Sequence, residues 1–348
     1  MTHNSLSIES LFKRGSDFLG TRYAILGGAM TWVSNHQLVA AISNSGGFGV
    51  LASGAMPPNI LSEEIDKTKL LTKKPFGVNL ITMHPRLDEM IDVCGQHKIS
   101  HVVLAGGLPN TSSFSRIKTH GCSVIGFAPA LAIAKKLIKM GTDAIIIEGS
   151  EAGGHIGPVS TSVLAQEILP EIREVPVFVA GGIGRGEAIV SYLQMGASGC
   201  QLGTRFVCAE ESPAHENFKQ AFIRAQARDA VVSLQLDQRF PVIPVRALTN
   251  KATKDFLEVQ ARVIKEYDNG ATDLKEAQLK IEHYWAGALK RAAIDGDIEN
   301  GSLMAGQSVG MVTKIQPTTE IMNDLIMQAN TFLKTSSNKA ASSSFPPS

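Results

Sequence analysis

The stretch Ala144-Ile-Ile-Ile-Glu-Gly-Ser-Glu-Ala-Gly-Gly-His-Ile-Gly157 joins a short apolar run to a glycine-rich loop that carries one histidine. The apolar run Ala144–Ile147 predicts a buried strand, and an amphipathic helical run begins at Thr161. The strand delivers the imidazole of His155 into a loop with almost no side-chain bulk beside it. Histidine titrates near neutral pH, so a ring placed there can accept or donate a proton. An isolated histidine in such a turn would more often only hydrogen-bond its loop, but its place at a strand end favours chemistry.

The same unit of strand, loop and helix recurs to about residue 226. Apolar runs without polar alternation predict strands that are covered on both faces, as in a parallel sheet. Helices between them supply the long crossovers that parallel pairing requires. The predicted strands are Ala24–Leu26, Gly49–Leu51, Phe76–Leu80, His101–Leu104, Ser123–Phe127, Ala144–Glu148, Pro176–Ala180 and Gly199–Leu202. The predicted helices include Asn35–Asn44, Asn59–Lys67, Ala130–Lys139, Thr161–Ile172 and Gly186–Met195.

Eight such units predict an α/β fold of the TIM-barrel type, the (β/α)₈ barrel. A doubly wound open sheet is the competing arrangement, but no Gly-x-Gly-x-x-Gly sequence follows the first strand. Glycine pairs follow four of the predicted strands. The loops after all strands of a barrel converge on one face. These paired glycines therefore leave space without side chains on that face, which suits a large, flat ligand.

From about Arg228 to Gln307 the alternation of strands and helices stops, and charged helical patterns dominate. The main ones are Lys254–Tyr267 and Leu274–Asp295. We therefore expect residues 228–307 to form a mainly helical C-terminal insertion that caps the barrel and contacts the substrate.

The barrel itself is then expected from residues 1–227 and 308–334. A last helix, Thr319–Leu333, is predicted to close it. Residues 335–348 are rich in Ser, Ala and Pro without an apolar period, which predicts a disordered tail.

The composition indicates a soluble globular protein and excludes several classes. The chain has 348 residues, of which 44% are hydrophobic and 19% charged. A formal net charge of +1 without a basic stripe gives no electrostatic case for a nucleic acid or an acidic membrane surface. No apolar run approaches the ~20 residues of a membrane span, and the N-terminus lacks a secretory pattern. We expect a cytoplasmic protein.

Cysteines and acidic residues give no sign of a metal centre. Four cysteines are scattered without CxxC or other metal-like spacing, and we expect them to be reduced: Cys94, Cys122, Cys200 and Cys208. No His, Asp or Glu group has ligand spacing, and no nucleophile motif is present. Glu148 and Glu151 flank Gly149-Ser150. Either carboxylate is able to orient His155; we interpret Glu148 as structural and leave Glu151 open.

Two neighbouring loops are equipped for a phosphate. Gly181-Gly182-Ile183-Gly184 follows the seventh predicted strand, and Gly203-Thr204 follows the eighth. Barrels commonly bind phosphate at these two loops with backbone N–H groups. The alternative is that these are ordinary turn glycines, but two adjacent loops favour the phosphate.

Other strand ends offer candidate contacts to a cofactor. Gly27–Trp32 follows the first strand, and its backbone amides and the Met30 thioether are suited to border an aromatic ring. Packing in the core is an equal alternative for Trp32. Asn79 ends the third strand, where its amide is available to a cofactor edge or a phosphate, or only caps a turn.

Together these segments resemble the nitronate monooxygenase family, formerly called 2-nitropropane dioxygenases. Flavin-dependent enoyl-acyl carrier protein reductases share the same motifs. The resemblance covers about residues 20 to 330. It rests on the stretches 27–33 (GGAMTWV), 74–80 (KPFGVNL), 148–157 (EGSEAGGHIG), 180–183 (AGGI), 201–206 (QLGTRF), 286–289 (AGAL) and 301–307 (GSLMAGQ).

The resemblance implies a TIM barrel that holds FMN without a covalent bond. It implies that the loop with Gly28, Ala29 and Met30 contacts the isoalloxazine, although Ala29 replaces a glycine that is usual there. Gly154 would line the flavin, and His155 would be the catalytic base or acid. The phosphate would be held by Ala180, Gly181, Gly182, Gln201, Gly203 and Thr204.

The leading functional hypothesis is an FMN-dependent nitronate monooxygenase that oxidises alkyl nitronates with O₂ to carbonyl compounds and nitrite. The alternative is a reductase in which NAD(P)H reduces FMN, which then reduces an enoyl thioester or a quinone, with His155 as proton donor. A flavin-binding protein without turnover is a third hypothesis, and the uncluttered His155 loop argues against it. A homodimer is a further expectation.

Overall fold

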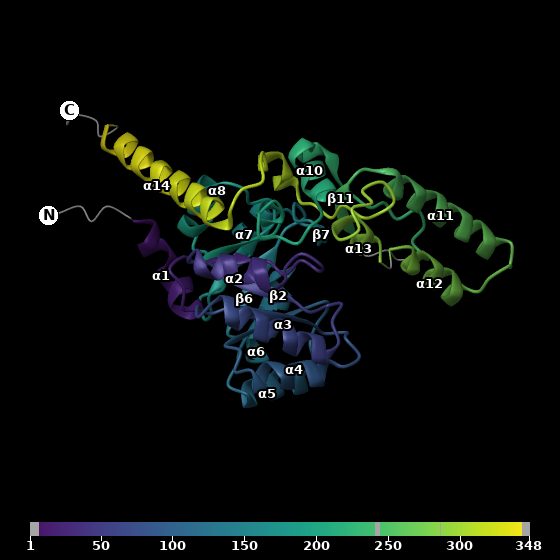
Figure 1. Cartoon of the computed structure of the whole chain (residues 1–348), viewed down its shortest axis with the longest axis horizontal. Helices are drawn as coiled ribbons and strands as arrows, with labels where there is room; N and C mark the ends of the chain where they lie inside the picture. Colours follow the sequence, from purple (N-terminus) through teal and green to yellow (C-terminus); the bar gives the residue numbers. More distant parts are fainter. Residues whose placement is uncertain (1–6, 241–243, 286, 343–348) are drawn as a thin grey trace.

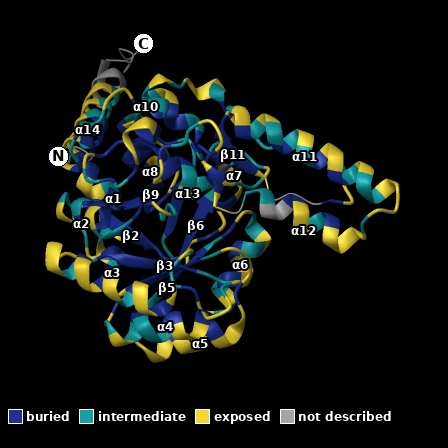
Figure 2. Ribbon diagram, turned by 45° about the vertical axis from the view of Figure 1, so that its right-hand side comes forward, coloured by how far each residue is buried: buried dark blue, intermediate teal, exposed yellow. Residues whose placement is uncertain are grey.

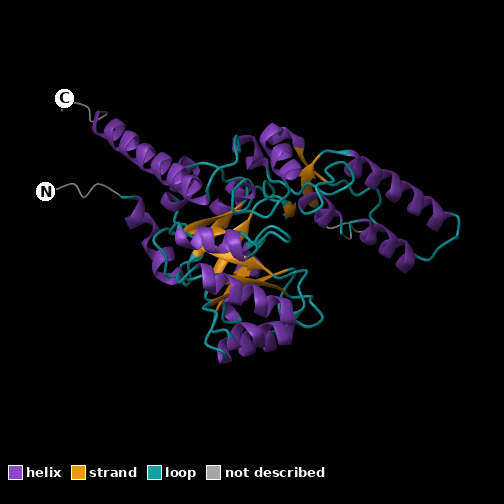
Figure 3. Cartoon of the chain, in the orientation of Figure 1, coloured by secondary structure: helices purple, strands orange, loops and turns teal. Residues whose placement is uncertain are grey.

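The computed structural model describes residues 7–240, 244–285 and 287–342. Within them, eight parallel strands close into a barrel, which confirms the predicted (β/α)₈ fold (Figures 1 and 3). The strands follow one another around the ring in chain order, and the last pairs with the first. They are β1 (Ile25–Gly27), β2 (Phe48–Ala52), β3 (Gly77–Ile81), β4 (His101–Ala105), β5 (Ser123–Phe127), β6 (Ala144–Glu148), β8 (Val177–Ala180) and β9 (Gly199–Leu202).

Helices surround the barrel and turn their buried faces toward it (Figure 2). The predicted strands β5, β6 and β9 match residue for residue, and the others differ only at their ends. The helices between strands are α2 (His36–Asn44), α3 (Pro58–Leu71), α4 (Leu87–Gln96), α5 (Thr111–Thr119), α6 (Leu131–Lys139), α7 (Thr161–Ile168) and α8 (Gly186–Gln194). After β9 the chain forms α9 (Thr204–Val207), α10 (Glu216–Arg224) and the short helix η1 (Ala227–Asp229).

The N-terminal helix α1 (Ile8–Leu19) covers the end of the barrel where the strands begin. The ring of Phe18 packs edge-on against His101, with centroids 4.8 Å apart, and lies 6.3 Å from the ring of Phe178. The carbonyl of Phe18 is also 3.0 Å from Nε2 of His101. His101 is thus a structural residue, and the opposite, C-terminal mouth is the end available to a ligand.

A second sheet lies at this mouth, with three antiparallel strands in the order β10-β11-β7 (Figure 3). β7 (Gly154–His155) comes from the loop after β6, and β10 (Ala230–Val232) and β11 (Val245–Leu248) come from the expected cap. The expectation that Gly154 and His155 lie in a loop was wrong, and the mainly helical segment 228–307 also contains the short strands β10 and β11. A strand of two residues has no alternation pattern, so only its pairing reveals it.

α11 (Lys251–Asp268) and α12 (Leu274–Tyr284) form a hairpin that extends away from the barrel (Figure 1). The hairpin has its own apolar core, made by Phe240, Phe256, Val263, Ala277 and Ile281. Because this core is separate from that of the barrel, we propose that the hairpin is the main body of the cap.

The predicted helix Leu274–Asp295 is two helices, α12 and α13 (Ala288–Ala293). Gly287 has a φ of 72°, and this left-handed conformation is incompatible with a continuous helix. Ala292 and Ala293 of α13 belong to the main core, so this part of the expected cap packs on the barrel.

α14 (Thr318–Ser342) follows the short helix η2 (Gln307–Met311), packs on α8 and α2, and corresponds to the predicted last helix. It continues through Ser342, so residues 335–342 are helical where a disordered tail was expected. The hydroxyl of Thr335 donates to the carbonyl of Thr331 at 2.9 Å. Adding a residue to a formed helix gains one hydrogen bond for one fixed residue, which favours this extension. The rest of the predicted tail, 343–348, lies outside the described residues.

All four cysteines (Cys94, Cys122, Cys200 and Cys208) are buried free thiols, as expected. Burial raises the pKa of the Cys208 thiol to about 12. In the described ranges, no helix combines the length and the apolarity needed to cross a bilayer.

Candidate active site

The second sheet fixes the backbone of His155. His155 lies opposite Val245 in the antiparallel pair of β7 and β11. The N–H of the next residue, Ile156, donates to the carbonyl of Pro244 at 3.0 Å. His155 therefore projects from a hydrogen-bonded strand, not from a free loop, at the C-terminal mouth of the barrel.

The imidazole of His155 is open to the mouth. The protein around the mouth removes part of its hydration, and this desolvation lowers the pKa of His155 below its usual value of 6.5. No described residue forms a hydrogen bond or an ion pair with the ring. The ring is therefore mainly neutral at neutral pH and is suited to accept a proton.

Glu151, which the sequence left open, caps α7. Its Oε2 accepts hydrogen bonds from the backbone N–H of Thr161 at 2.8 Å and from the Thr161 hydroxyl at 2.9 Å. A carboxylate at this position satisfies a helix donor that has no partner within the helix, and it interacts favourably with the helix dipole. Glu151 thus ties the loop that carries His155 to the start of α7.

Gly181 and Gly182, directly after the buried Ala180, both have left-handed backbone, with φ of 99° and 70°. Successive N–H groups in such a turn face one concave point, which binds anions. A Cβ at Gly182 would lie 2.9 Å from Cβ of Glu151, so the position has neither the conformation nor the space for a larger residue.

Gly28, Met30, Gln201 and Gly203 come together where the neighbouring strands β1 and β9 end. A Cβ at Gly28 would lie 3.2 Å from the side chain of Gln201. A Cβ at Gly203 would lie 3.5 Å from Sδ of Met30. Gln201 is buried, and Ala29 packs against the main core.

The structure adds the segment Gly301–Gln307 to this site. Oγ1 of Thr204 accepts a hydrogen bond from the N–H of Gly306 at 2.9 Å. Sδ of Met304 would be 3.6 Å from a Cβ at Gly154, whose φ is 78°. The glycine-rich composition of this segment was the sequence signal for it, but nothing local indicated which loop it would contact.

Asn79 lies on a different strand from the other candidates. It lies in β3, which β2 and β1 separate from β9 in the barrel. Its side chain is buried, and its Nδ2 donates to the carbonyl of Val103 at 3.1 Å. The other predicted residues lie on or beside β6, β8, β9 and β1. The Nδ2 group of Asn79, in contrast, is already hydrogen-bonded within the barrel.

Trp32 connects the loop after β1 to α13. Its φ is 68°, which is unusual for a bulky residue, and 38% of it is exposed. Nζ of Lys290, on α13, lies 5.3 Å from the centre of the indole ring, within the range of a cation–π interaction. Backbone strain of this kind is concentrated at functional sites, so this contact is a candidate for substrate selection at the rim.

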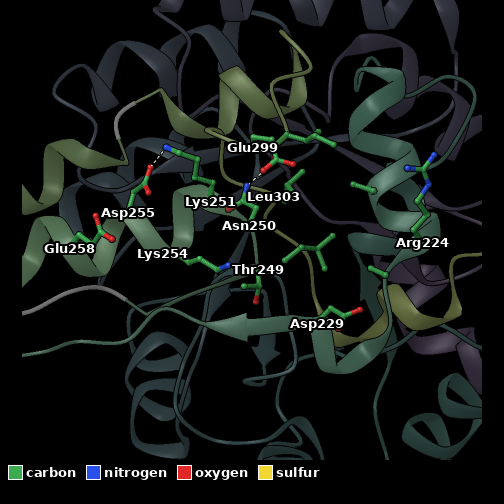
Figure 4. Close-up of a pocket in the computed structure, with 14 residues that line it drawn as sticks. Arg224, Asp229, Thr249, Asn250, Lys251, Lys254, Asp255, Glu258, Glu299 and Leu303 are labelled. Carbon is green, nitrogen blue, oxygen red and sulfur yellow. Dashed lines mark hydrogen bonds and ion pairs between the residues drawn. The ribbon is translucent and has the colours of Figure 1, made fainter.

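A separate cavity of about 630 Å³ lies between α10 and α11 (Figure 4). Its lining mixes positive and negative side chains, and Nζ of Lys251 already binds Asp255 at 2.5 Å. Among the described residues, none of the predicted site residues lines it. The barrel mouth is therefore the better candidate for the active site.

Comparison with known proteins places this site in a family. The model of the nitronate monooxygenase family matches residues 13–100 and 85–328. The (3aS,4S,5R,7aS)-5-hydroxy-7a-methyl-1-oxo-octahydro-1H-indene-4-carboxyl-CoA dehydrogenase of Rhodococcus jostii (strain RHA1) is 28% identical, over 90% of this chain and 94% of its own. A probable nitronate monooxygenase of Staphylococcus aureus (strain MRSA252) is 27% identical, over 92% of this chain and 98% of its own.

Similar solved structures include enzymes of the same kind. FabK from Thermotoga maritima superposes with a TM-score of 0.83 and 34% identity, over 94% of this chain and 98% of its own. A nitroalkane oxidase from Streptomyces ansochromogenes superposes with a TM-score of 0.74 and 25% identity, over 92% of this chain and 99% of its own. This protein is an oxidoreductase, and its chain belongs to the nitronate monooxygenase family.

Proposed function

We propose that this protein is an FMN-dependent nitronate monooxygenase, which oxidises alkyl nitronates with O₂ to carbonyl compounds and nitrite. Membership of the family supports the proposal, as does the similarity to a nitroalkane oxidase. The proposed substrate is a small molecule, and a cytoplasmic location and a homodimer remain predictions.

The residues at the mouth fit FMN. The left-handed turn at Gly181 and Gly182 offers N–H groups to a phosphate. Gly28, Gly154 and Gly203 add no side chain of their own at the mouth, where a Cβ at Gly28 would already lie 3.2 Å from the side chain of Gln201. The flavin would accept electrons from the substrate and pass them to O₂.

The observation that carries the proposal is the neutral imidazole of His155, open at the mouth without a carboxylate partner among the described residues. A neutral ring can donate one hydrogen bond to a nitronate oxygen, or accept the α-proton of a neutral nitroalkane as a general base. Glu151 does not compete for this role, because its carboxylate is bound to the start of α7.

The second candidate is an NAD(P)H-dependent reductase of enoyl thioesters or quinones. The similarity to FabK and to a dehydrogenase of a CoA thioester favours it. In that reaction His155 would donate a proton, and the lowered pKa leaves less of the protonated ring to do so.

Anaerobic flavin reduction separates the two candidates. The purified holoenzyme is mixed without O₂ with ethyl or propyl nitronate, and separately with NADH or NADPH, while the flavin absorbance is followed. Bleaching by the nitronate alone supports the monooxygenase. Bleaching by the pyridine nucleotide alone, with reoxidation by an enoyl thioester, would establish the reductase, and a protein that binds no FMN would exclude both.

A further inference from the structure

The inner face of the barrel is apolar where β3, β4 and β5 end at the mouth. A Cβ at Gly126 of β5 would lie 3.0 Å from a side chain of α6, so the Gly126 position faces outward. Because successive side chains of a strand alternate, the next residue, Phe127, faces the interior. Leu104 of β4 is the register partner of Gly126, and paired residues of neighbouring strands share a face, so Leu104 also points outward. Ala105 after it, and its own partner Ile81 of β3, therefore face inward.

The inner face becomes polar at the next strand. Ile145 of β6 is the register partner of Gly126 and faces outward, so Glu148, three residues later, faces inward. The loop after β6 then carries Glu151 and His155. The mouth therefore has an apolar side at β3, β4 and β5 and a polar side that begins at β6, and His155 belongs to the polar side.

The loops that follow β2, β3, β4 and β5 carry almost no charge. They comprise residues 53–57, 82–86, 106–110 and 128–130. Within these described residues there is no acidic side chain and no lysine, and Arg86 is the single side chain with a permanent charge. Both carboxylate oxygens of Glu89 already hold its guanidinium, at 2.8 and 2.6 Å. Nδ1 of the neighbouring His84 accepts the N–H of Arg86 at 3.1 Å. These loops therefore suit an uncharged part of a ligand.

Two of these loops expose large apolar side chains at the rim of the mouth. Met83 is 72% exposed and Leu108 is 44% exposed. The hydroxyl of Thr82 donates to the carbonyl of Gly106 at 2.7 Å, which holds the two loops side by side. A Cβ at Gly106 would lie 2.9 Å from Cγ2 of Ile81, so the rim continues directly from the inner face. Apolar side chains that continue one another in this way mark a binding surface.

Ile81, Met83, Leu108 and Phe127 thus form one apolar surface that leads from the inner face to the rim. Ile81 and Phe127 are partly exposed, and only the small Ala105 lies between their strands. A flexible hydrocarbon chain has the shape and the polarity for such a surface, and a charged group does not.

We propose that this apolar surface binds the hydrocarbon chain of the substrate and makes the enzyme selective for nitronates with long unbranched chains, hexyl or longer. The identity of the head group rests on the function proposed above. With the nitronate group toward His155, on the polar side, the chain extends across Ile81 and Phe127 to the rim. An ethyl group leaves most of this surface in water, whereas each further methylene removes apolar area from water and strengthens binding.

A series of nitronates tests the selectivity. The second-order rate constant of anaerobic flavin reduction is measured in the holoenzyme for ethyl, butyl, hexyl and octyl nitronate. We expect it to rise about twofold for each added methylene, which is half of the free energy of full burial. The readout is the ratio of the octyl to the ethyl constant, because a general loss of activity cancels in a ratio.

The double variant Met83→Ser/Leu108→Ser tests the surface itself. Its octyl-to-ethyl ratio is expected to fall about fivefold or more, because the end of the chain loses its apolar contacts. Leu70→Ser/Leu71→Ser is the matched control, since both leucines are exposed at the end of α3 that lies away from the mouth. The control should keep the wild-type ratio within about twofold. Circular dichroism checks that both variants fold.

Binding of non-reacting carboxylates provides a readout without turnover. Propanoate and nonanoate have the shapes of ethyl and octyl nitronate, and calorimetry at several temperatures gives their affinities and heat-capacity changes. Nonanoate should bind the wild type more tightly and with a more negative heat-capacity change, which marks apolar burial. Both differences should shrink in Met83→Ser/Leu108→Ser and persist in the control.

Flavin reduction at equal rates by ethyl and octyl nitronate would overturn this inference and leave the proposed function standing. An unchanged octyl-to-ethyl ratio in Met83→Ser/Leu108→Ser would show that the chain lies elsewhere and would also overturn it. If no nitronate reduces the flavin, the proposed function fails, and selectivity for nitronates fails with it. The carboxylate titrations then decide by themselves whether the apolar surface binds a hydrocarbon chain.

Discussion

Nε of Arg246, on β11, donates a hydrogen bond to the carbonyl of Ser150 at 2.8 Å and so ties the second sheet to the loop that carries His155. Nη1 of the same guanidinium donates to the carbonyl of Ala230 at 2.5 Å. The side chain is 8% exposed, and desolvation lowers the pKa of Arg246, which the charge of Glu151 opposes. A buried cation thus joins the segment after β9 to the loop that carries His155.

Arg246→Gln is expected to destabilise the protein by about 1–3 kcal/mol, because a shorter side chain leaves at least one buried carbonyl unpaired. We also expect kcat to fall, since β7 loses part of its support. Urea unfolding and steady-state kinetics measure the two effects. Arg262→Gln, on an exposed part of α11, is the control and should stay within about 0.5 kcal/mol of the wild type. Wild-type stability and turnover in Arg246→Gln would contradict this coupling.

His155→Asn is expected to retain FMN and to lose about 10²-fold or more in turnover if the imidazole is a general base. The visible flavin spectrum checks binding, and nitrite release checks turnover. His120→Asn, which changes the partner of Asp92 in α4, is a control outside the mouth. Turnover that survives in His155→Asn would remove this residue from the mechanism.

The pH dependence of kcat/KM reports the state of His155. Because desolvation lowers the pKa of His155, the neutral base form persists to lower pH than for a solvated histidine. With a neutral nitroalkane as substrate, kcat/KM should therefore rise with pH, inflect below 6.5 and stay level through neutral pH. His155→Asn should lack this inflection. A rate that instead falls as pH rises through this range would indicate that the protonated ring acts as an acid.

Gly182→Ala is expected to weaken FMN binding, because the new Cβ would lie 2.9 Å from Cβ of Glu151 in a turn with φ of 70°. Gly196→Ala is the matched control, since its φ is 107° and nothing lies within 4 Å of its Cβ. Both variants carry backbone strain of about 1 kcal/mol or more. Only Gly182→Ala should lose affinity for FMN, measured by fluorescence titration, and equal losses in both would argue against a phosphate site at Gly182.

The stability of the apoprotein should depend on pH through Glu148. Burial raises the pKa of Glu148 to about 8 in the folded state, above its usual value of 4.5. Between these values the folded state keeps a proton that the unfolded state has lost, so stability falls as pH rises through this window and then levels off. Glu148→Gln removes this contribution, so its stability relative to the wild type should increase from about pH 5 to about pH 8. Urea unfolding across this range measures it, and a constant difference would mean that Glu148 is solvated.

Glu148 and Glu151, which flank Gly149-Ser150 ahead of His155, show what could not be predicted from the sequence. The strand Ala144–Glu148 was predicted to the residue, but its face was not, because an unbroken apolar run has no polar alternation that marks inside and outside. Glu148 was interpreted as structural and Glu151 left open, yet Glu151 is the one that caps a helix. That Glu148 faces the interior follows only from the register of β5, β6 and β8.

The sequence by itself determined the barrel, the order of its strands, and the glycine-rich loops at the end where they converge, because burial periodicity and glycine placement are local properties of each segment. The tertiary structure alone decided that His155 pairs with Val245, that Arg246 supports its loop and that Gly306 contacts Thr204. These contacts join residues about a hundred positions apart or nearly so. Such pairings follow from how the closed barrel and the later segment pack together, and no local pattern encodes them.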